Sequence, residues 1–146
     1  MDKILVLSGP SLNLLGTREP HIYGHATLDQ IHARLKAQAK AAGFGLEARQ
    51  SNHEGELVDW IGGAPGTYAG IVLNPAALAH SSVALRDAVA AVAIPTVEVH
   101  LSNVFAREEF RQTLVVAAAT RGVITGFGPD SYALGLEALL NILRQT

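Results

Sequence analysis

The sequence predicts a doubly wound α/β protein, in which helices cover both faces of a parallel β-sheet. Short apolar runs that end in Gly, Pro or Asn alternate along the chain with segments whose apolar residues recur at helical spacing. This alternation is typical of parallel strands joined by helical crossovers. The chain has 146 residues, of which 49% are apolar and 16% charged. We therefore expect one domain over residues 1–146 with a substantial core.

The predicted elements follow one another without a linker or an internal repeat. The expected strands are residues 3–8, 46–50, 70–73, 95–99 and 122–125. The first helix is expected to begin after Thr27, where Thr27 and Gln30 can form a capping box, and to stop at Gly43. The other helices are expected over residues 54–61, after the capping residue Ser82, briefly over 107–111, and around Leu136, Leu139, Leu140 and Leu143. Five strands in this length suit the flavodoxin-like layout, with strand order 2-1-3-4-5.

Composition excludes several classes of protein. The net charge is −2 and no basic block occurs, so we expect no nucleic-acid partner and no anionic membrane partner. The chain has no cysteine, and its six histidines lack metal-ligand spacing, so we expect no metal site. No phosphate-binding glycine motif of either standard kind is present. Without a signal peptide or an apolar run of membrane-spanning length, the expectation is a cytoplasmic protein.

A long connection follows the first predicted strand and extends over about residues 9–26. Connections of this length are uncommon in compact domains and are usually functional or disordered. It carries Arg18, Glu19 and Tyr23, so a lid over a site and a floppy insertion are the two interpretations that length alone allows.

Ligands of open parallel sheets bind beyond the carboxyl ends of the strands, and polar residues gather there in this sequence. They are Ser11, Asn13, Arg18 and Tyr23 after strand one, Asn74 and His80 after strand three, and His100, Ser102 and Asn103 after strand four. Glu98, His100 and Ser102 are spaced by two, which places them on one face of a strand. A carboxylate beside an imidazole favours its charged form and makes it a proton donor. A purely structural pair under a helix is the alternative.

Tyr23 is a candidate base, although a loop tyrosine is more often a surface aromatic. A tyrosine hydroxyl stays protonated at neutral pH unless cations stabilise its phenolate. Arg18, Arg107 and Arg111 are the candidate cations. The three lysines, Lys3, Lys36 and Lys40, lie on elements that face away from the expected site, so a Schiff-base mechanism is not expected.

Four motifs together resemble the type II 3-dehydroquinate dehydratases. They are GPSLNLLGTREPHIYG (9–24), RQSNHEGELVDWI (49–61), NPAALAHSSVALRDA (74–88) and VEVHLSNVFAREEFR (97–111). The resemblance covers nearly the whole chain in the same order. It implies a flavodoxin-like fold, no cofactor, a dodecamer built from trimers, and dehydration of 3-dehydroquinate by anti elimination through an enolate. The same chemistry serves aromatic biosynthesis and quinate breakdown.

The resemblance also implies roles for individual residues. Tyr23 would be the base, Arg18 would stabilise its phenolate, and His100 supported by Glu98 would protonate the departing hydroxyl. The implied substrate-binding residues are Asn74, His80, Arg111 and the backbone N–H groups of Leu101 and Ser102, with Asp87 reaching the site of a neighbouring subunit and Arg107 in the cationic surround.

The chain departs from the family pattern at several positions. Ser11 replaces an asparagine that helps to hold a water near the enolate, and a serine hydroxyl donates only one hydrogen bond. Residues 112–116 also differ, in a stretch that builds subunit contacts in relatives. Two rival hypotheses remain open at this point: a non-catalytic relative that binds a quinate-like metabolite, and a flavin-binding electron carrier of the same fold.

Overall fold

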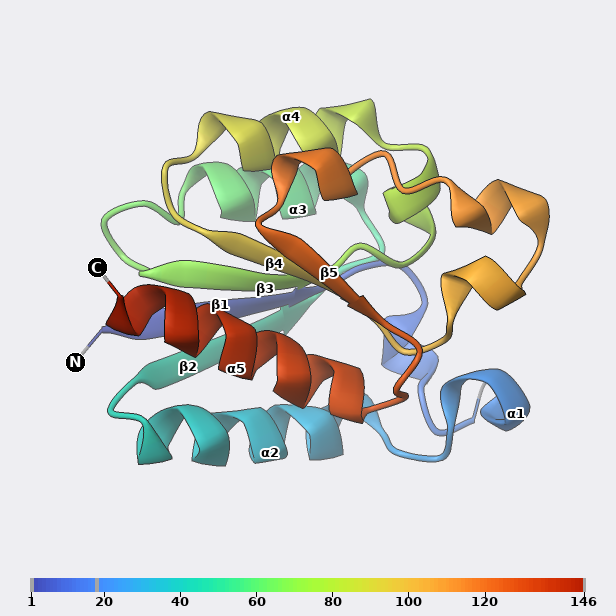
Figure 1. Cartoon of the computed structure of the whole chain (residues 1–146), viewed down its shortest axis with the longest axis horizontal. Coiled ribbons are helices and arrows are strands. Elements are labelled where there is room, and N and C mark those ends of the chain that lie inside the picture. The colour runs from blue at the N-terminus through green and yellow to red at the C-terminus, as the bar shows by residue number, and fades with distance from the viewer. Residues whose placement is uncertain (1, 18, 146) are drawn as a thin grey trace.

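The computed structural model describes residues 2–17 and 19–145, and it confirms the predicted five-stranded sheet (Figure 1). All strands are parallel, in the order β2-β1-β3-β4-β5. Their bounds are β1 Lys3–Ser8, β2 Gly45–Gln50, β3 Gly70–Asn74, β4 Thr96–His100 and β5 Gly122–Thr125. The three inner strands are almost wholly buried, whereas the edge strands β2 and β5 are half-buried.

Two pairs of helices cover the two faces of the sheet (Figure 1). α2 (Leu28–Ala41) and α5 (Asp130–Arg144) lie on one face, and α3 (Glu54–Gly62) and α4 (Val83–Ala91) lie on the other. The predicted caps are present. Thr27 and Gln30 form a reciprocal capping box, and the Ser82 hydroxyl accepts from the Leu85 N–H at 2.9 Å. These caps satisfy backbone N–H groups that a helix leaves unpaired at its start.

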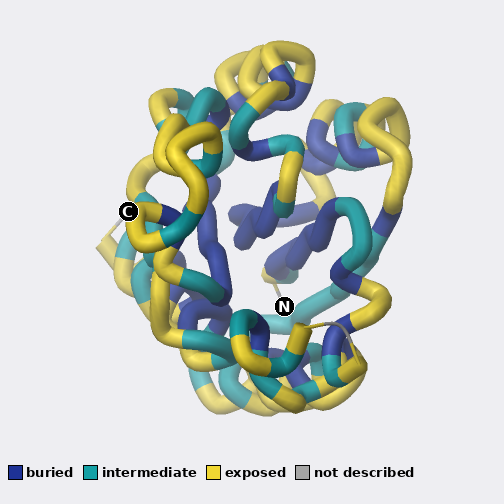
Figure 2. The backbone as a smooth tube through the Cα atoms, turned by 90° about the vertical axis from the view of Figure 1, so that its right-hand side faces the viewer, coloured by how far each residue is buried: buried dark blue, intermediate teal, exposed yellow. Residues whose placement is uncertain are grey.

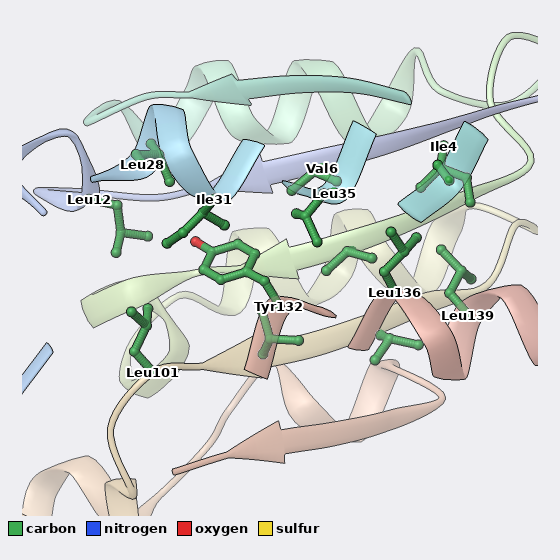
Figure 3. Close-up of a cluster of buried hydrophobic side chains, with 14 of the residues drawn as sticks. Ile4, Val6, Leu12, Leu28, Ile31, Leu35, Leu101, Tyr132, Leu136 and Leu139 are labelled. Atoms are coloured by element: carbon green, nitrogen blue, oxygen red, sulfur yellow. The ribbon is translucent and has the colours of Figure 1, made fainter. Parts of the chain in front are cut away.

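The alternation of side chains along the strands divides the core into two clusters. Ile4 and Val6 of β1 face α2 and α5, whereas Leu5 and Leu7 face α3 and α4. Figure 3 shows the first cluster, which includes Leu35 and Leu136 from the two covering helices. α5 approaches the sheet closely, because a Cβ atom at Gly135 would collide with Val99 of β4. Small residues therefore decide how tightly this helix packs.

The structure corrects the expectations at several element boundaries. The segment over 9–26 is not irregular throughout, since it contains the 3₁₀ helix Leu12–Leu14 and the short helix α1 (Pro20–Tyr23). Residues 107–111 do not form one short helix. Instead two 3₁₀ helices, Val104–Ala106 and Glu109–Gln112, lie on either side of residues 107–108. Strand β4 runs to His100 rather than ending at Val99. Two further 3₁₀ helices, Ala76–His80 and Ala117–Ala119, were not predicted.

Most of these short segments lie beyond the carboxyl ends of the strands, on the side of α1 in Figure 1. Figure 2 looks onto this side and shows the buried strands in the middle, surrounded by more exposed loops. Among the described residues, no helix combines the length and apolar character that crossing a membrane requires.

Candidate active site

A pocket opens at the carboxyl ends of β1, β3 and β4, where the sequence places its polar residues. Segments from the 9–26 connection, from the end of β3 and from the loop after β4 form its wall. The lining residues are Pro10, Ser11, Leu12, Tyr23, Asn74, Ala76, Ala77, His80, His100, Leu101, Ser102, Val104, Arg107 and Arg111. Its position agrees with the general location of ligand sites in open parallel sheets.

Tyr23 is buried at one wall of this pocket and is held there by Arg107. Nη1 of Arg107 donates to the Tyr23 hydroxyl oxygen at 3.0 Å, and the guanidinium lies 5.3 Å from the centre of the Tyr23 ring. The same Nη1 also donates to the Ser102 hydroxyl at 3.4 Å. A guanidinium cannot lose its proton in a protein, so this contact places a permanent positive charge beside the phenol oxygen.

His100 lies at another wall, with Glu98 behind it. Nε2 of His100 lies 2.6 Å from Oε2 of Glu98, and the two side chains are 6% and 0% exposed. A carboxylate accepts, so Nε2 carries the proton of this bond, and Nδ1 is the ring nitrogen left for the pocket. The second carboxylate oxygen, Oε1 of Glu98, is buried with no hydrogen-bond partner among the described residues. Glu98 and His100 thus form a buried hydrogen-bonded pair, in which His100 lines the pocket and Glu98 does not.

His80 lies beside His100, with ring centres 6.3 Å apart and planes inclined by 27°. Its Nδ1 lies 2.9 Å from the Thr113 carbonyl oxygen, which can only accept, so Nδ1 carries a hydrogen. Burial is the main cause that lowers the pKa of His80, and the nearby His100 and Arg111 lower it further, while the bond to Thr113 opposes them. His80 is therefore neutral at neutral pH and offers Nε2 as an acceptor.

Asn74 ends β3 and forms a tight turn with the residues after it. Its Oδ1 accepts from the Ala76 N–H at 3.0 Å, and Ala76 adopts a left-handed conformation with φ of 53°. The Asn74 carbonyl accepts from the Gly9 N–H at 2.8 Å, and a Cβ atom at Gly9 would stand 2.6 Å from the Pro75 carbonyl oxygen. The close approach that glycine permits thus brings the ends of β1 and β3 together at the pocket floor.

The cations of the site are balanced from outside by one carboxylate. Glu108 lies 3.7 Å from Arg107 and 3.2 Å from Arg111, each measured to the guanidinium Nε. The pKa of the exposed Glu108 is lowered, first by its own backbone N–H and then by Arg111. Arg107 and Arg111 bring two positive charges to the pocket, and Glu108 brings one exposed negative charge. The excess of positive charge makes the pocket suited to an anionic ligand.

Most residues that the sequence singled out come together here. Tyr23, Asn74, His80, His100, Leu101, Ser102 and Arg111 line the pocket, and Glu98 lies directly behind His100. Arg18 lies outside the described residues. Asp87 is exposed on α4 and does not line the pocket of its own chain. Asn13, which also follows β1, is exposed and does not line this pocket.

From the sequence, Arg107 was one of three candidate cations for Tyr23, and the resemblance placed it only in the cationic surround. The structure makes it a partner of Tyr23. Its place just after the His100 segment was the signal in the sequence. Tyr23 and Arg107 are 84 positions apart, however, and no local sequence pattern connects them. The structure also shows no cluster of His, Asp and Glu able to hold a metal ion within the described part of the chain.

Fold and site together define an α/β protein with an acid–base pocket. One wall offers a phenol beside a guanidinium, and another offers an imidazole backed by a carboxylate, the kind of groups that move protons on a small anionic molecule. Comparison with known proteins makes this class more specific, because the sequence matches the family described as dehydroquinase class II over residues 2–140. The chain belongs to this family.

Individual relatives agree over nearly the full length. A 3-dehydroquinate dehydratase of Azorhizobium caulinodans is 59% identical over 138 residues, which cover 94% of this chain and 93% of the relative. One from Sinorhizobium medicae is 54% identical over 143 residues, covering 98% and 97%. The crystal structure of a type II dehydroquinase from Propionibacterium acnes superposes with a TM-score of 0.92 at 42% identity and covers 97% of both chains.

Proposed function

We propose that the chain dehydrates 3-dehydroquinate to 3-dehydroshikimate, with Tyr23 as the base and His100 as the acid. The observation that carries this assignment is the arrangement of the pocket. The Tyr23 hydroxyl is bound by Arg107 at 3.0 Å, and His100 is bound by Glu98 at 2.6 Å, and both residues line the same pocket. The family relationship supports the reaction, and the geometry supports the roles.

The first step breaks a C–H bond next to the substrate ketone. The Tyr23 phenolate takes the proton, and the bonding electrons move onto the carbonyl oxygen to form an enolate. Arg107 favours this step because its guanidinium stabilises the phenolate that must form before the proton can be taken. Arg18 is proposed as a second cation for the same phenolate. No lysine is among the described residues that line the pocket, so no Schiff base is proposed.

The second step expels the hydroxyl group on the carbon beyond the enolate. The enolate electrons re-form the ketone, a carbon–carbon double bond forms, and the C–O bond breaks. Nδ1 of His100 delivers the proton that turns the leaving hydroxyl into water. Glu98 supports this step, because its carboxylate holds Nε2–H and stabilises the imidazolium that waits to donate. Solvent then returns a proton to His100 and removes one from Tyr23.

The remaining residues of the pocket are proposed to hold the substrate. Asn74, His80 and Arg111 bind its hydroxyl groups, and the backbone N–H groups of Leu101 and Ser102 bind its carboxylate. All five line the pocket. The segment over residues 9–26 is proposed to act as a lid, since it supplies Pro10, Ser11, Leu12 and Tyr23 to the pocket wall.

The test is a turnover assay on the purified chain without any added cofactor. The product is a conjugated enone acid, so turnover appears as rising ultraviolet absorbance. Tyr23→Phe removes only the hydroxyl, and we expect it to lower the rate by about 10³-fold while substrate binding persists, because general-base catalysis contributes roughly 10²–10⁴. Tight binding by the wild type without turnover would establish the non-catalytic alternative, and near-normal turnover of Tyr23→Phe would overturn the base assignment.

We also propose that the chain acts as a homo-oligomer, with trimers assembled into a dodecamer and Asp87 reaching a neighbouring subunit's pocket. Several large apolar side chains are exposed on the isolated chain and support an assembly: Leu14, Val83, Phe105, Phe110, Phe127 and Leu134. Sedimentation of the wild type measures the size. Mixing inactive Asp87→Ala chains with inactive Tyr23→Phe chains tests the shared site, because recovered activity requires residues from two subunits. A cytoplasmic location is a further proposal, which cell fractionation checks.

A further inference from the structure

Tyr132, at the start of α5, is fully buried among apolar side chains, and the proposed reaction does not use it. Figure 3 shows its ring beside Ile31, with the hydroxyl oxygen on the side of Leu12, which belongs to the pocket wall. A hydroxyl in such a place is costly unless it is fully hydrogen-bonded. Two polar partners satisfy it, and one of them is the pocket residue Asn74.

Hydrogen bonds join these three side chains in a row. Nδ2 of Asn74 donates to the Tyr132 oxygen at 3.1 Å, and that oxygen lies 2.8 Å from Oγ of Ser8, at the end of β1. Either hydroxyl can donate in the bond between Tyr132 and Ser8, and in both cases the Tyr132 oxygen keeps a lone pair for the Asn74 Nδ2–H.

The opposite end of the Asn74 amide is fixed as well. Oδ1 accepts from the N–H of Ala76, which can only donate. A flipped amide would set two donors, Nδ2–H and the Ala76 N–H, against each other, so the Ala76 contact decides the orientation. Asn74 is 2% exposed and lines the pocket, and its second Nδ2 hydrogen has no partner in the part of the chain that the structure describes.

We propose that Tyr132, itself bound to Ser8, is a positioning residue: by accepting one Nδ2 hydrogen it holds the Asn74 amide in place, so that the other Nδ2 hydrogen is offered to a substrate oxygen. This inference rests on the proposed function for the identity of the substrate. Burial raises the pKa of Tyr132 to about 12, so its hydroxyl keeps its hydrogen at neutral pH. Asn74 is thus held for substrate binding by Tyr132, which lies behind the pocket and does not contact the substrate.

Turnover of four chains tests the coupling: wild type, Tyr132→Phe, Asn74→Ala and the double variant. We expect Tyr132→Phe to lower kcat/KM by about tenfold, mainly through KM, which is the effect of losing one hydrogen bond of ordinary strength. In the Asn74→Ala background the same change should have almost no effect, since Tyr132 then has nothing to position. An equal loss in both backgrounds would overturn the proposal, as would wild-type kcat/KM in Tyr132→Phe.

The matched control is Tyr68→Phe, which removes a hydroxyl bound to Glu47 and Arg49 outside the pocket and should leave kcat/KM unchanged. Ser8→Ala provides a second variant in case Tyr132→Phe folds poorly. It removes the other hydrogen-bond partner of the Tyr132 hydroxyl, so we expect a loss of several-fold that again vanishes in the Asn74→Ala background. An equal loss of kcat/KM from Ser8→Ala in the wild-type and Asn74→Ala backgrounds would contradict the positioning role of Tyr132.

A measurement without turnover separates this inference from the proposed function. The side-chain amide signals of Asn74 in a ¹H–¹⁵N spectrum are identified by their disappearance in Asn74→Ala. We expect Tyr132→Phe and Ser8→Ala to move them and Tyr68→Phe to leave them in place. If the wild type proved inactive, the proposed reaction would fail, but the movement of these signals would still test whether Tyr132 positions Asn74. Unmoved Asn74 signals in Tyr132→Phe would overturn the positioning role of Tyr132.

Discussion

Arg107 donates to the hydroxyl oxygen of Tyr23 across 84 positions of sequence, at 3.0 Å. α1 carries the phenol, and the segment between two 3₁₀ helices after β4 carries the guanidinium. The contact forms because both segments lie beyond the carboxyl ends of the strands. It joins the candidate base to a permanent positive charge, and it is the long-range feature on which the proposed first step depends most.

The first prediction concerns this charge. Arg107→Met keeps most of the side-chain volume but removes the cation from Tyr23, and we expect the rate to fall by about 10²-fold, the usual order for one lost electrostatic contact at a reacting group. Steady-state kinetics measures the loss. Arg34→Met is the control, because Arg34 forms an exposed ion pair with Asp130 outside the pocket and should leave turnover unchanged. An unaltered rate in Arg107→Met would remove Arg107 from the mechanism.

The second prediction concerns the buried partner of His100. Glu98→Gln preserves the shape of the side chain but replaces the carboxylate, so the imidazolium loses the negative charge that favours it. We expect kcat to fall by about 10²-fold, within the range of general acid–base effects, with a similar melting temperature. Glu47→Gln removes a carboxylate that binds Lys3 outside the pocket, and it should retain wild-type kinetics. Equal kcat values for the wild type and Glu98→Gln would show that the pair is only structural.

The third prediction concerns Ser11, which lines the pocket in a left-handed conformation with φ of 69° and makes no capping bond with its side chain. Asparagine adopts this conformation more readily than serine does. We expect Ser11→Asn to raise the free energy of unfolding by about 0.5 kcal/mol, and Ser11→Ala to give no increase. Urea denaturation measures both. Turnover of Ser11→Asn should equal or exceed that of the wild type, and a less stable Ser11→Asn would contradict the argument from backbone strain.

The fourth prediction is a pH dependence of stability. An unfolded tyrosine loses its proton near pH 10, whereas the pKa of buried Tyr132 is raised to about 12, so between these values the folded chain holds more protons. The contribution of Tyr132 to stability is therefore complete below pH 10 and is lost as the pH rises towards 12.

Denaturation of the wild type and Tyr132→Phe at a series of alkaline pH values checks this expectation. Above pH 10 the free energy of unfolding of the wild type should fall more steeply, by up to about 1.4 kcal/mol per pH unit relative to the variant. Tyr68, whose pKa burial also raises, is present in both chains and cancels in the difference. Parallel curves for the two chains would contradict the raised pKa.

The local part of this structure follows from short-range patterns. The capping box at Thr27 and the cap at Ser82 were predicted, because a helix start depends on side chains within three residues of it. The contact between Glu98 and His100 also follows from the sequence, since residues two apart share a face of a strand whatever surrounds them. The strand order was predicted differently, from the flavodoxin-like layout that five alternating strands and helices of this length suit.

The sequence alone therefore determined the order of strands and helices, the face that carries Glu98 and His100, and the edge of the sheet where the site lies. Tertiary structure alone decided that Tyr23 contacts Arg107 and that Tyr132 contacts both Asn74 and Ser8. The physical reason is range. Backbone geometry fixes the relation between neighbours within one element, whereas contacts between loops and helix ends depend on how every intervening element packs.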